Sequence, residues 1–136
     1  MVASPAYLRD RGEPRDPEAL ARHEALVHLP TGGVPGRWTL VSAEREAAVQ
    51  VSGALRTNAL HALREAALEG KGIAFLPEWM VRDDVARGAL QVLLPAFRSR
   101  EVTVLALHRS ELRGTARVRA LVTHLRAAWK QPYRGV

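Results

Sequence analysis

The spacing of apolar and polar residues changes several times along the chain, and each change predicts a new element. Residues 48–55 alternate between apolar and polar or small side chains, which predicts a strand with one buried face. From Asn58 the period lengthens to that of an amphipathic helix. The apolar face of this helix consists of Leu60, Leu63 and Ala67. Gly70 and Gly72 are typical helix-stop residues and end it.

Short apolar runs between turn residues predict the remaining strands. These runs cover residues 25–29, 38–41, 73–76, 90–94 and 102–107. Residues 30–36 form a loop by composition. Asp16 before Pro17 predicts a short helix over 17–23, because aspartate caps helices and proline fits their first turn. Strands and helices therefore alternate, which indicates an α/β sandwich with helices on the faces of a sheet.

Two further helices complete the pattern. Pro77 stands where a helix would begin, and Gly88 stands at its far end. An apolar stripe predicts a last helix of about four turns over residues 115–129. The members of this stripe are Val118, Leu121, Val122, Leu125 and Trp129.

Composition narrows the class of protein. A chain of 136 residues with 47% hydrophobic residues has the size of one domain and can bury a core. The chain has no cysteine, which excludes disulfides and thiolate metal sites. The sequence shows no apolar run of membrane-spanning length and no secretion signal, so we expect a cytoplasmic protein with no membrane partner.

The formal net charge of +6 raises the possibility of nucleic-acid binding. The arginines are spread singly from Arg9 to Arg134, however, and only 5% of the residues are aromatic, which leaves few platforms for stacked bases. A basic nucleic-acid-binding protein therefore stays an alternative.

Residues 51–95 carry a specific combination of motifs. A strand ends in Thr57-Asn58, an alanine-rich helix follows, and a Gly-x-Gly-Ile-Ala turn leads into the next strand. Leu76-Pro77 then begins another helix, and a Gly-x-Leu introduces a strand that closes at Leu94-Pro95. In this order and spacing the chain resembles the effector-binding domain of LysR-type transcriptional regulators. The segments VASPAYL and RVRALVTHLRAAW extend the resemblance over essentially Val2 to Trp129.

The resemblance implies a periplasmic-binding-protein-like (type 2) α/β sandwich. Residues 1–101 would form the second effector-binding subdomain with its crossover segment, and residues 102–136 would be a strand and helix of subdomain one. In this interpretation the chain is truncated at its N-terminus, without the winged helix-turn-helix, and only one wall of the cleft between the subdomains is whole. DNA would be a partner only through the missing domain.

The candidate effector-binding residues are Thr57, Asn58, Leu76, Pro77 and Glu78. Thr57 and Asn58 open a helix whose free amides and dipole suit an anionic group, and a plain helix cap is the competing explanation. The other three lie at the carboxyl edge of the sheet, where open α/β folds bind ligands, although Pro77 is also a common first helical residue. We expect Trp79 to pack rather than to line the cleft.

Other chemistry is not indicated. The five histidines show no metal-ligand spacing, and the serines stand in no nucleophile context, so we expect no metal, no cofactor and no catalytic residue. Gly70 to Gly72 lacks the spacing of a phosphate loop. Asp83-Asp84 are interpreted as part of a solvated helix face.

The sequence thus predicts a non-enzymatic sensor of a small, acidic organic effector. Self-association or pairing with a LysR-type regulator is expected. Two further alternatives stay open: an interaction protein that pairs with intact relatives through apolar surface on residues 102–107, and a gene fragment without function.

Overall fold

The computed structural model describes residues 1–29, 35–100, 107, 109–112 and 114–129. The chain divides into two compact units, Met1–Arg100 and Glu101–Val136. The elements of the first unit are β1 (Val2–Ala3), α1 (Pro5–Arg11), the 3-10 helix η1 (Glu18–Arg22), β2 (Ala25–His28), β3 (Arg37–Val41), β4 (Glu46–Gln50), β5 (Arg56–Thr57), α2 (Leu60–Leu68), β6 (Ile73–Ala74), α3 (Glu78–Ala86), β7 (Gln91–Val92) and β8 (Arg98–Ser99). The second unit holds η2 (Ser110–Leu112) and α4 (Ala116–Trp129).

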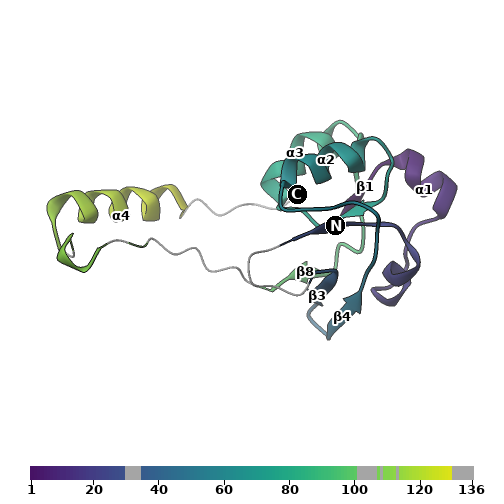
Figure 1. Ribbon diagram of the computed structural model, residues 1–136, viewed down its shortest axis with the longest axis horizontal. Coiled ribbons are helices and arrows are strands. Elements are labelled where there is room, and N and C mark those ends of the chain that lie inside the picture. Colours follow the sequence, from purple (N-terminus) through teal and green to yellow (C-terminus); the bar gives the residue numbers. More distant parts are fainter. Residues whose placement is uncertain (30–34, 101–106, 108, 113, 130–136) are drawn as a thin grey trace. The chain divides into compact units, whose positions relative to one another are not determined.

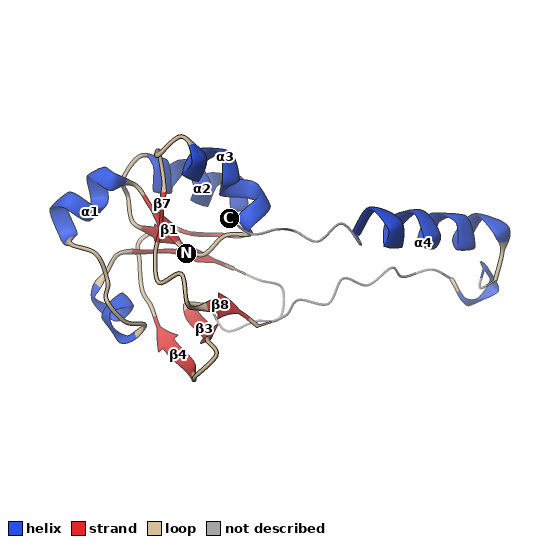
Figure 2. Cartoon of the chain, turned by 180° about the vertical axis from the view of Figure 1, so that it is seen from behind, coloured by secondary structure: helices blue, strands red, loops and turns tan. Residues whose placement is uncertain are grey.

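The first unit is organised around a five-stranded sheet in the order β5-β2-β6-β1-β7. β2 runs parallel to both β5 and β6, whereas β1 runs antiparallel to both β6 and β7. A second sheet has three strands in the order β4-β3-β8 (Figures 1 and 2). The predicted α/β architecture is therefore present, with a small antiparallel sheet added.

The three inner strands of this sheet, β2, β6 and β1, are buried, and their alternating side chains enter two different cores. Leu26 and Ala74 lie in a core under α2 and α3, together with Leu63 and Ala67 of the predicted helix face. The neighbouring strand residues point to the other core, beneath α1 and the three-stranded sheet. That second core includes Ala3, Tyr7, Ala25, Val27, Trp38, Leu40 and Ile73. Figure 1 shows α2 and α3 on one side and β3, β4 and β8 on the other.

The strand predicted over 48–55 is wrong in its extent. β4 ends at Gln50, after which Ser52 pairs with Glu24 beside β2. The chain crosses between the two sheets here, and a Cβ on Gly53 would lie 1.8 Å from the Ala25 carbonyl oxygen. The alternation of apolar and polar residues continues past the end of β4, because Val49 and Val51 on either side of it lie in the same core.

The helix ends follow the predicted capping chemistry in part. The Asp16 side chain accepts a hydrogen bond from the Ala19 amide at 2.7 Å, and the expected short helix is the 3-10 helix η1. The sequence did not predict α1, which begins after Ser4, whose hydroxyl accepts from the Tyr7 amide. Gly70 has a φ of +73°, and α2 ends just before it, as expected for a helix-stop glycine.

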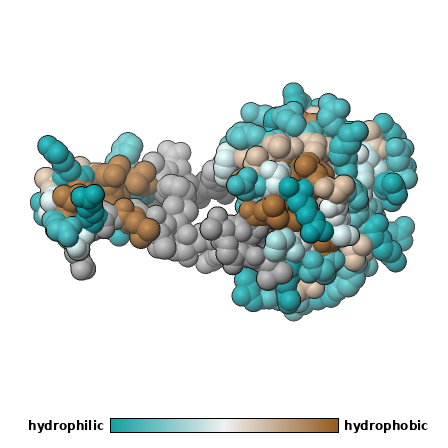
Figure 3. Space-filling view, in the orientation of Figure 1, coloured by the Kyte–Doolittle hydropathy of each residue, from teal (hydrophilic) through white to brown (hydrophobic). Residues whose placement is uncertain are grey.

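The second unit contains the expected last helix. α4 spans Ala116–Trp129, in agreement with the predicted 115–129. Val118, Val122 and Leu125 are half-buried, while Leu121 is 57% exposed. Figure 3 shows hydrophobic side chains gathered on the visible face of this unit. Of the strand predicted over 102–107, residues 102–106 lie outside the described residues, as do residues 30–34 of the predicted loop 30–36.

Candidate functional site

The two strand-to-helix junctions predicted as a site lie at one edge of the five-stranded sheet. β5, β2 and β6 are adjacent and parallel, so their carboxyl ends meet at the same edge. Thr57 pairs with His28 at the ends of β5 and β2, and Leu26 pairs with Ala74 two residues before Leu76. We call this edge the carboxyl rim. It consists of Thr57, Asn58, His28, Leu76, Pro77 and Glu78.

Thr57 joins the sheet to α2. Its carbonyl accepts a hydrogen bond from the Leu29 amide at 2.9 Å, which holds β5 to the end of β2. Its hydroxyl oxygen accepts from the Ala59 amide at 3.1 Å. The half-buried Thr57 side chain therefore orders the turn that leads into α2.

The expected helix cap at Asn58 is wrong. α2 begins at Leu60, its N-cap position is Ala59, and no side chain makes a capping hydrogen bond there. Asn58 is exposed in the preceding turn. Because the first amides of a helix have no intrahelical acceptor, the start of α2 presents uncapped N–H groups close to the rim.

The second junction has an apolar floor and an acidic edge. Leu76 is buried and Pro77 is half-buried at the N-cap position of α3, where its carbonyl accepts from the Met80 amide at 3.1 Å. Glu78 is exposed in the first turn of α3. The expectation that Trp79 packs inside is wrong, because 57% of this residue is exposed.

His28 is a rim residue that sequence reasoning did not select. It ends β2, the strand between β5 and β6, and is half-buried opposite Thr57. An imidazole can donate a hydrogen bond to a carboxylate in either protonation state. The signal for His28 lies in the strand order, which places β2 between two strands that come later in the sequence.

A buried ion cluster connects the two helices that start at the rim. Asp84 of α3 is 1% exposed and accepts hydrogen bonds from Arg64 of α2 and from Arg87. Interpreting Asp83-Asp84 as a solvated pair is therefore wrong for Asp84. Burial raises the pKa of Asp84, but its bonds to Arg64 and then Arg87 outweigh burial and hold this pKa below its ordinary value.

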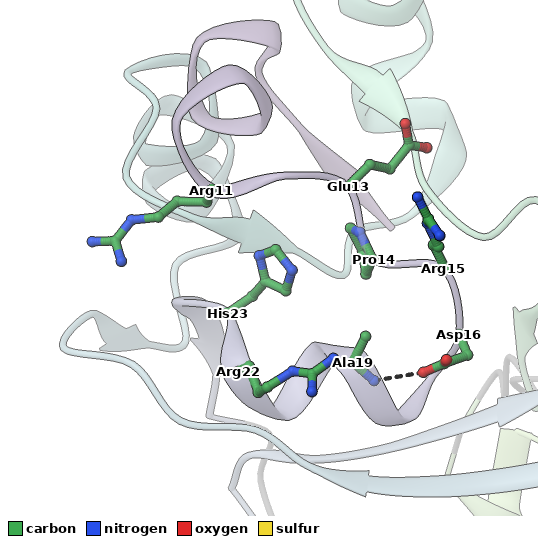
Figure 4. Close-up of a pocket in the computed structure, with 8 residues that line it drawn as sticks. All are labelled: Arg11, Glu13, Pro14, Arg15, Asp16, Ala19, Arg22 and His23. Carbon is green, nitrogen blue, oxygen red and sulfur yellow. Dashed lines mark hydrogen bonds between the residues drawn. The ribbon is translucent and has the colours of Figure 1, made fainter.

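A surface hollow of the first unit lies away from the carboxyl rim. It has a volume of about 390 Å³ and is lined by residues before β2, at the opposite end of that strand from the rim. Its lining residues are Arg11, Glu13, Pro14, Arg15, Asp16, Ala19, Arg22 and His23 (Figure 4). We call this hollow the arginine pocket. None of the predicted effector-binding residues lines it.

The described residues lack two further features. Within the described ranges no three His, Asp or Glu side chains are grouped so that they could hold a metal ion. No helix in that same part of the chain has the length and apolar character that crossing a bilayer requires.

Similarity to known proteins defines the family of this chain. Residues 1–130 match the LysR substrate binding domain, and the chain belongs to this family. The family consists of non-enzymatic transcription regulators.

Curated relatives agree along nearly the whole chain. The HTH-type transcriptional activator TtdR of Escherichia coli K12 is 33% identical over 131 residues, which cover 96% of this chain and 42% of the relative. The HTH-type transcriptional regulator PtxR of Pseudomonas aeruginosa is 34% identical over 134 residues, covering 98% and 43% respectively. The chain therefore spans less than half the length of these relatives.

Solved structures show the same fold. The regulatory domain of CrgA from Neisseria meningitidis superposes with a TM-score of 0.71 at 29% identity, covering 91% of this chain and 61% of that domain. The full-length Vibrio cholerae virulence activator AphB gives a TM-score of 0.65 at 30% identity over 73% of this chain and 33% of that protein. The predicted periplasmic-binding-protein-like α/β fold is confirmed.

Proposed function

We propose that this chain is an effector-sensing portion of a LysR-type regulator and that it binds a small organic acid at the carboxyl rim. Thr57, Asn58, Leu76, Pro77 and Glu78 are the proposed contacts, and His28 joins them. The observation that carries the proposal is the parallel trio β5-β2-β6, whose carboxyl ends bring both junctions to one edge.

The chemistry of the rim supports an acidic effector more than a neutral one. Uncapped amides at the start of α2 and the His28 imidazole supply hydrogen-bond donors for a carboxylate. Buried Leu76 supplies an apolar floor. The exposed Glu78 repels a second negative charge, so it favours acids whose carboxylate approaches from the β5 side.

We propose further that residues 1–101 form subdomain two and that residues 102–136 belong to subdomain one. The division of the chain after Arg100 into two compact units supports this assignment. In a cleft between two subdomains, an effector that touches both walls shifts the equilibrium between their arrangements. Since such regulators act on DNA, we place the protein in the cytoplasm.

A ligand screen tests the proposal. Thermal unfolding is followed with a panel of small mono- and dicarboxylic acids at fixed pH and ionic strength. A binding acid present at 100 times its Kd stabilises the fold by about 2.7 kcal/mol. We expect at least one acid to raise the unfolding temperature, and we expect no DNA binding by the chain in a gel-shift assay.

Matched variants locate the binding. Thr57→Val removes the hydroxyl that orders the turn before α2 and is expected to abolish the stabilisation, while Thr57→Ser retains it. Thr39→Val in β3 is the control, because it makes the same change in the other sheet. Two results would contradict binding at the carboxyl rim. One is that no acid in the panel raises the unfolding temperature, and the other is that the Thr57→Val and Thr39→Val variants lose the stabilisation equally. Tight, salt-sensitive DNA binding by the chain itself would favour the basic nucleic-acid-binding alternative.

The apolar stripe of α4 supports a second candidate function, pairing with another copy or with an intact relative. Leu121 is 57% exposed on this stripe. Leu121→Lys is expected to shift the chain toward monomer in sedimentation analysis, whereas Thr123→Lys adds the same charge at an exposed position of α4 and should not. A wild-type monomer at micromolar concentration contradicts this candidate.

A further inference from the structure

A buried tyrosine fixes the protonation state of the histidine in the arginine pocket. Tyr7 is 6% exposed, and its hydroxyl accepts a hydrogen bond from the Glu24 amide at 3.0 Å. The same hydroxyl lies 3.1 Å from Nδ1 of His23. Because a buried O–H requires an acceptor for its own proton, the hydroxyl donates to Nδ1. His23 is then neutral and carries its proton on Nε2, which is free to donate elsewhere.

The electrostatics of the pocket agree with a neutral imidazole. Burial lowers the pKa of His23 first, and the positive charges of Arg22 and Arg11 lower it further. Figure 4 shows the imidazole between the Pro14 segment and η1, with Arg22 lying along η1 and Arg11 extending outward.

The acidic side chains of the pocket already have partners, whereas its arginines do not. Asp16 accepts from the Ala19 amide at 2.7 Å, and Glu13 accepts from the Gln91 side-chain amide at 3.0 Å. Arg11, Arg15 and Arg22 make no hydrogen bond or ion pair with any other described residue. The donors left available in the lining are thus three guanidinium groups and one imidazole N–H.

We propose that the arginine pocket binds a phosphate dianion, either free or as a monoester, held by Arg11 and Arg22 with the Nε2–H of His23 as a third donor. Guanidinium groups match phosphate oxygens with paired N–H donors. The three arginines of the lining outnumber its two carboxylates, Glu13 and Asp16, so the pocket carries an excess of positive charge that attracts an anion. The hollow, at about 390 Å³, has room for such a group.

This site is distinct from the carboxyl rim. His23 and η1 precede β2, so the pocket lies at the amino end of the strand whose carboxyl end carries His28. Rim variants such as Thr57→Val are therefore expected to leave phosphate binding unchanged. The two sites can be tested independently.

The test is a phosphate titration of the full chain labelled with 15N, at pH 7.5 and constant ionic strength set with NaCl. Histidine ring and arginine Nε signals are followed by NMR. We expect saturable shifts confined to His23, Arg11 and Arg22, and a ring spectrum of the Nε2–H tautomer. The Arg11→Ala/Arg22→Ala double variant should weaken binding at least about tenfold, because it removes two charge-assisted donors.

Controls separate the site from general charge effects. Arg117→Ala/Arg119→Ala removes the same charge at exposed positions of α4 and should bind phosphate as the wild type does. Glycerol phosphate replaces inorganic phosphate in a second titration, and binding of either one supports the site. The proposal is overturned if the NMR shift changes rise linearly, without saturation, with both inorganic phosphate and glycerol phosphate. It is also overturned if the two double variants weaken phosphate binding equally. Tyr7→Phe tests the third donor: an unchanged His23 tautomer and affinity would remove His23 from the site.

Discussion

Arg64 of α2 donates two hydrogen bonds to Asp84 of α3, from Nε to Oδ2 at 2.6 Å and from Nη2 to Oδ1 at 2.7 Å. Arg87 adds a third bond to Oδ1 at 2.6 Å. Because α2 and α3 begin at the two junctions of the carboxyl rim, this contact fixes the spacing of the proposed effector site.

Asp84→Asn is expected to lower the free energy of unfolding by about 2 kcal/mol, since hydrogen bonds to charged groups contribute roughly 1.5–3 kcal/mol. Urea denaturation measures the change. Asp83→Asn, at the exposed neighbouring position, should alter stability by less than about 0.5 kcal/mol. Equal effects of the two variants would contradict a structural role for the cluster.

The same residue predicts an acid dependence. Its pKa is depressed in the fold, so its stabilising contribution is present above the unfolded pKa and is lost as the pH falls through the folded value. The difference in unfolding free energy between wild type and Asp84→Asn should therefore shrink in strong acid. If the difference in unfolding free energy between the two proteins stays constant down to the lowest pH measured, the ion pair of Asp84 is contradicted.

His23 predicts a second pH dependence, in a higher range. Its pKa lies below the ordinary value because of burial and the charges of Arg22 and Arg11, so the neutral form is favoured in the folded state. Stability from this group is full above the unfolded pKa of about 6.5 and declines as the pH falls toward the folded value.

His23→Asn retains an acceptor for the Tyr7 hydroxyl but does not titrate. The variant should show a flatter loss of stability below pH 6.5, measured by urea denaturation at several pH values. The Tyr7 hydroxyl contacts this ring and the charges of Arg22 and Arg11 act on it, and the variant leaves these three groups in place. Parallel pH profiles of the two proteins would contradict the assigned neutral ring.

Substitution of two tryptophans tests which of them is buried. Trp38 is 7% exposed and packs against Phe75 with ring centroids 5.5 Å apart, whereas Trp79 is 57% exposed. Trp38→Ala should cost about 3–5 kcal/mol of unfolding free energy. Trp79→Ala should change stability by less than about 0.5 kcal/mol. A comparable loss in both would contradict the exposed position of Trp79.

Gly53 tests the crossing between the sheets. Alanine there would place its Cβ on the Ala25 carbonyl, which belongs to a buried strand, so Gly53→Ala is expected to cost roughly 3 kcal/mol. Gly88→Ala meets open space and costs only the left-handed backbone penalty of about 1 kcal/mol. Thermal and urea unfolding compare the two variants, and the reverse ranking would refute the close approach.

Periodicity predicted those parts of the fold that depend on local burial. The face of Leu63 and Ala67 and the helix over 115–129 were found because their apolar spacing reflects one helix at a time. The strand over 48–55 was drawn too long because both sheets share one core, so the alternation does not stop where β4 ends. Resemblance to the LysR-type family supplied the periplasmic-binding-protein-like fold type, which patterning alone did not give.

Contacts between residues that are far apart in the chain could not be predicted from the sequence. The sequence indicates a solvated Asp84 because its partner Arg64 lies twenty positions earlier, on another helix. His28 was not selected because only the strand order shows that β2 lies between the two junctions. The cap assigned to Asn58 failed because the Thr57 hydroxyl orders the turn and α2 starts two residues later.

β1 is hydrogen-bonded on both sides, with Val2 opposite Ala74 in β6 and opposite Val92 in β7, and the Met1 carbonyl accepts from the Leu93 amide at 2.9 Å. Any polypeptide joined ahead of Met1 therefore enters the sheet between two other strands rather than through a loose tail. A pull or twist arriving along that polypeptide would act on β1, which belongs to the same sheet as the carboxyl rim. A guest bound at the proposed rim and such an upstream segment would then be mechanically linked through one short strand.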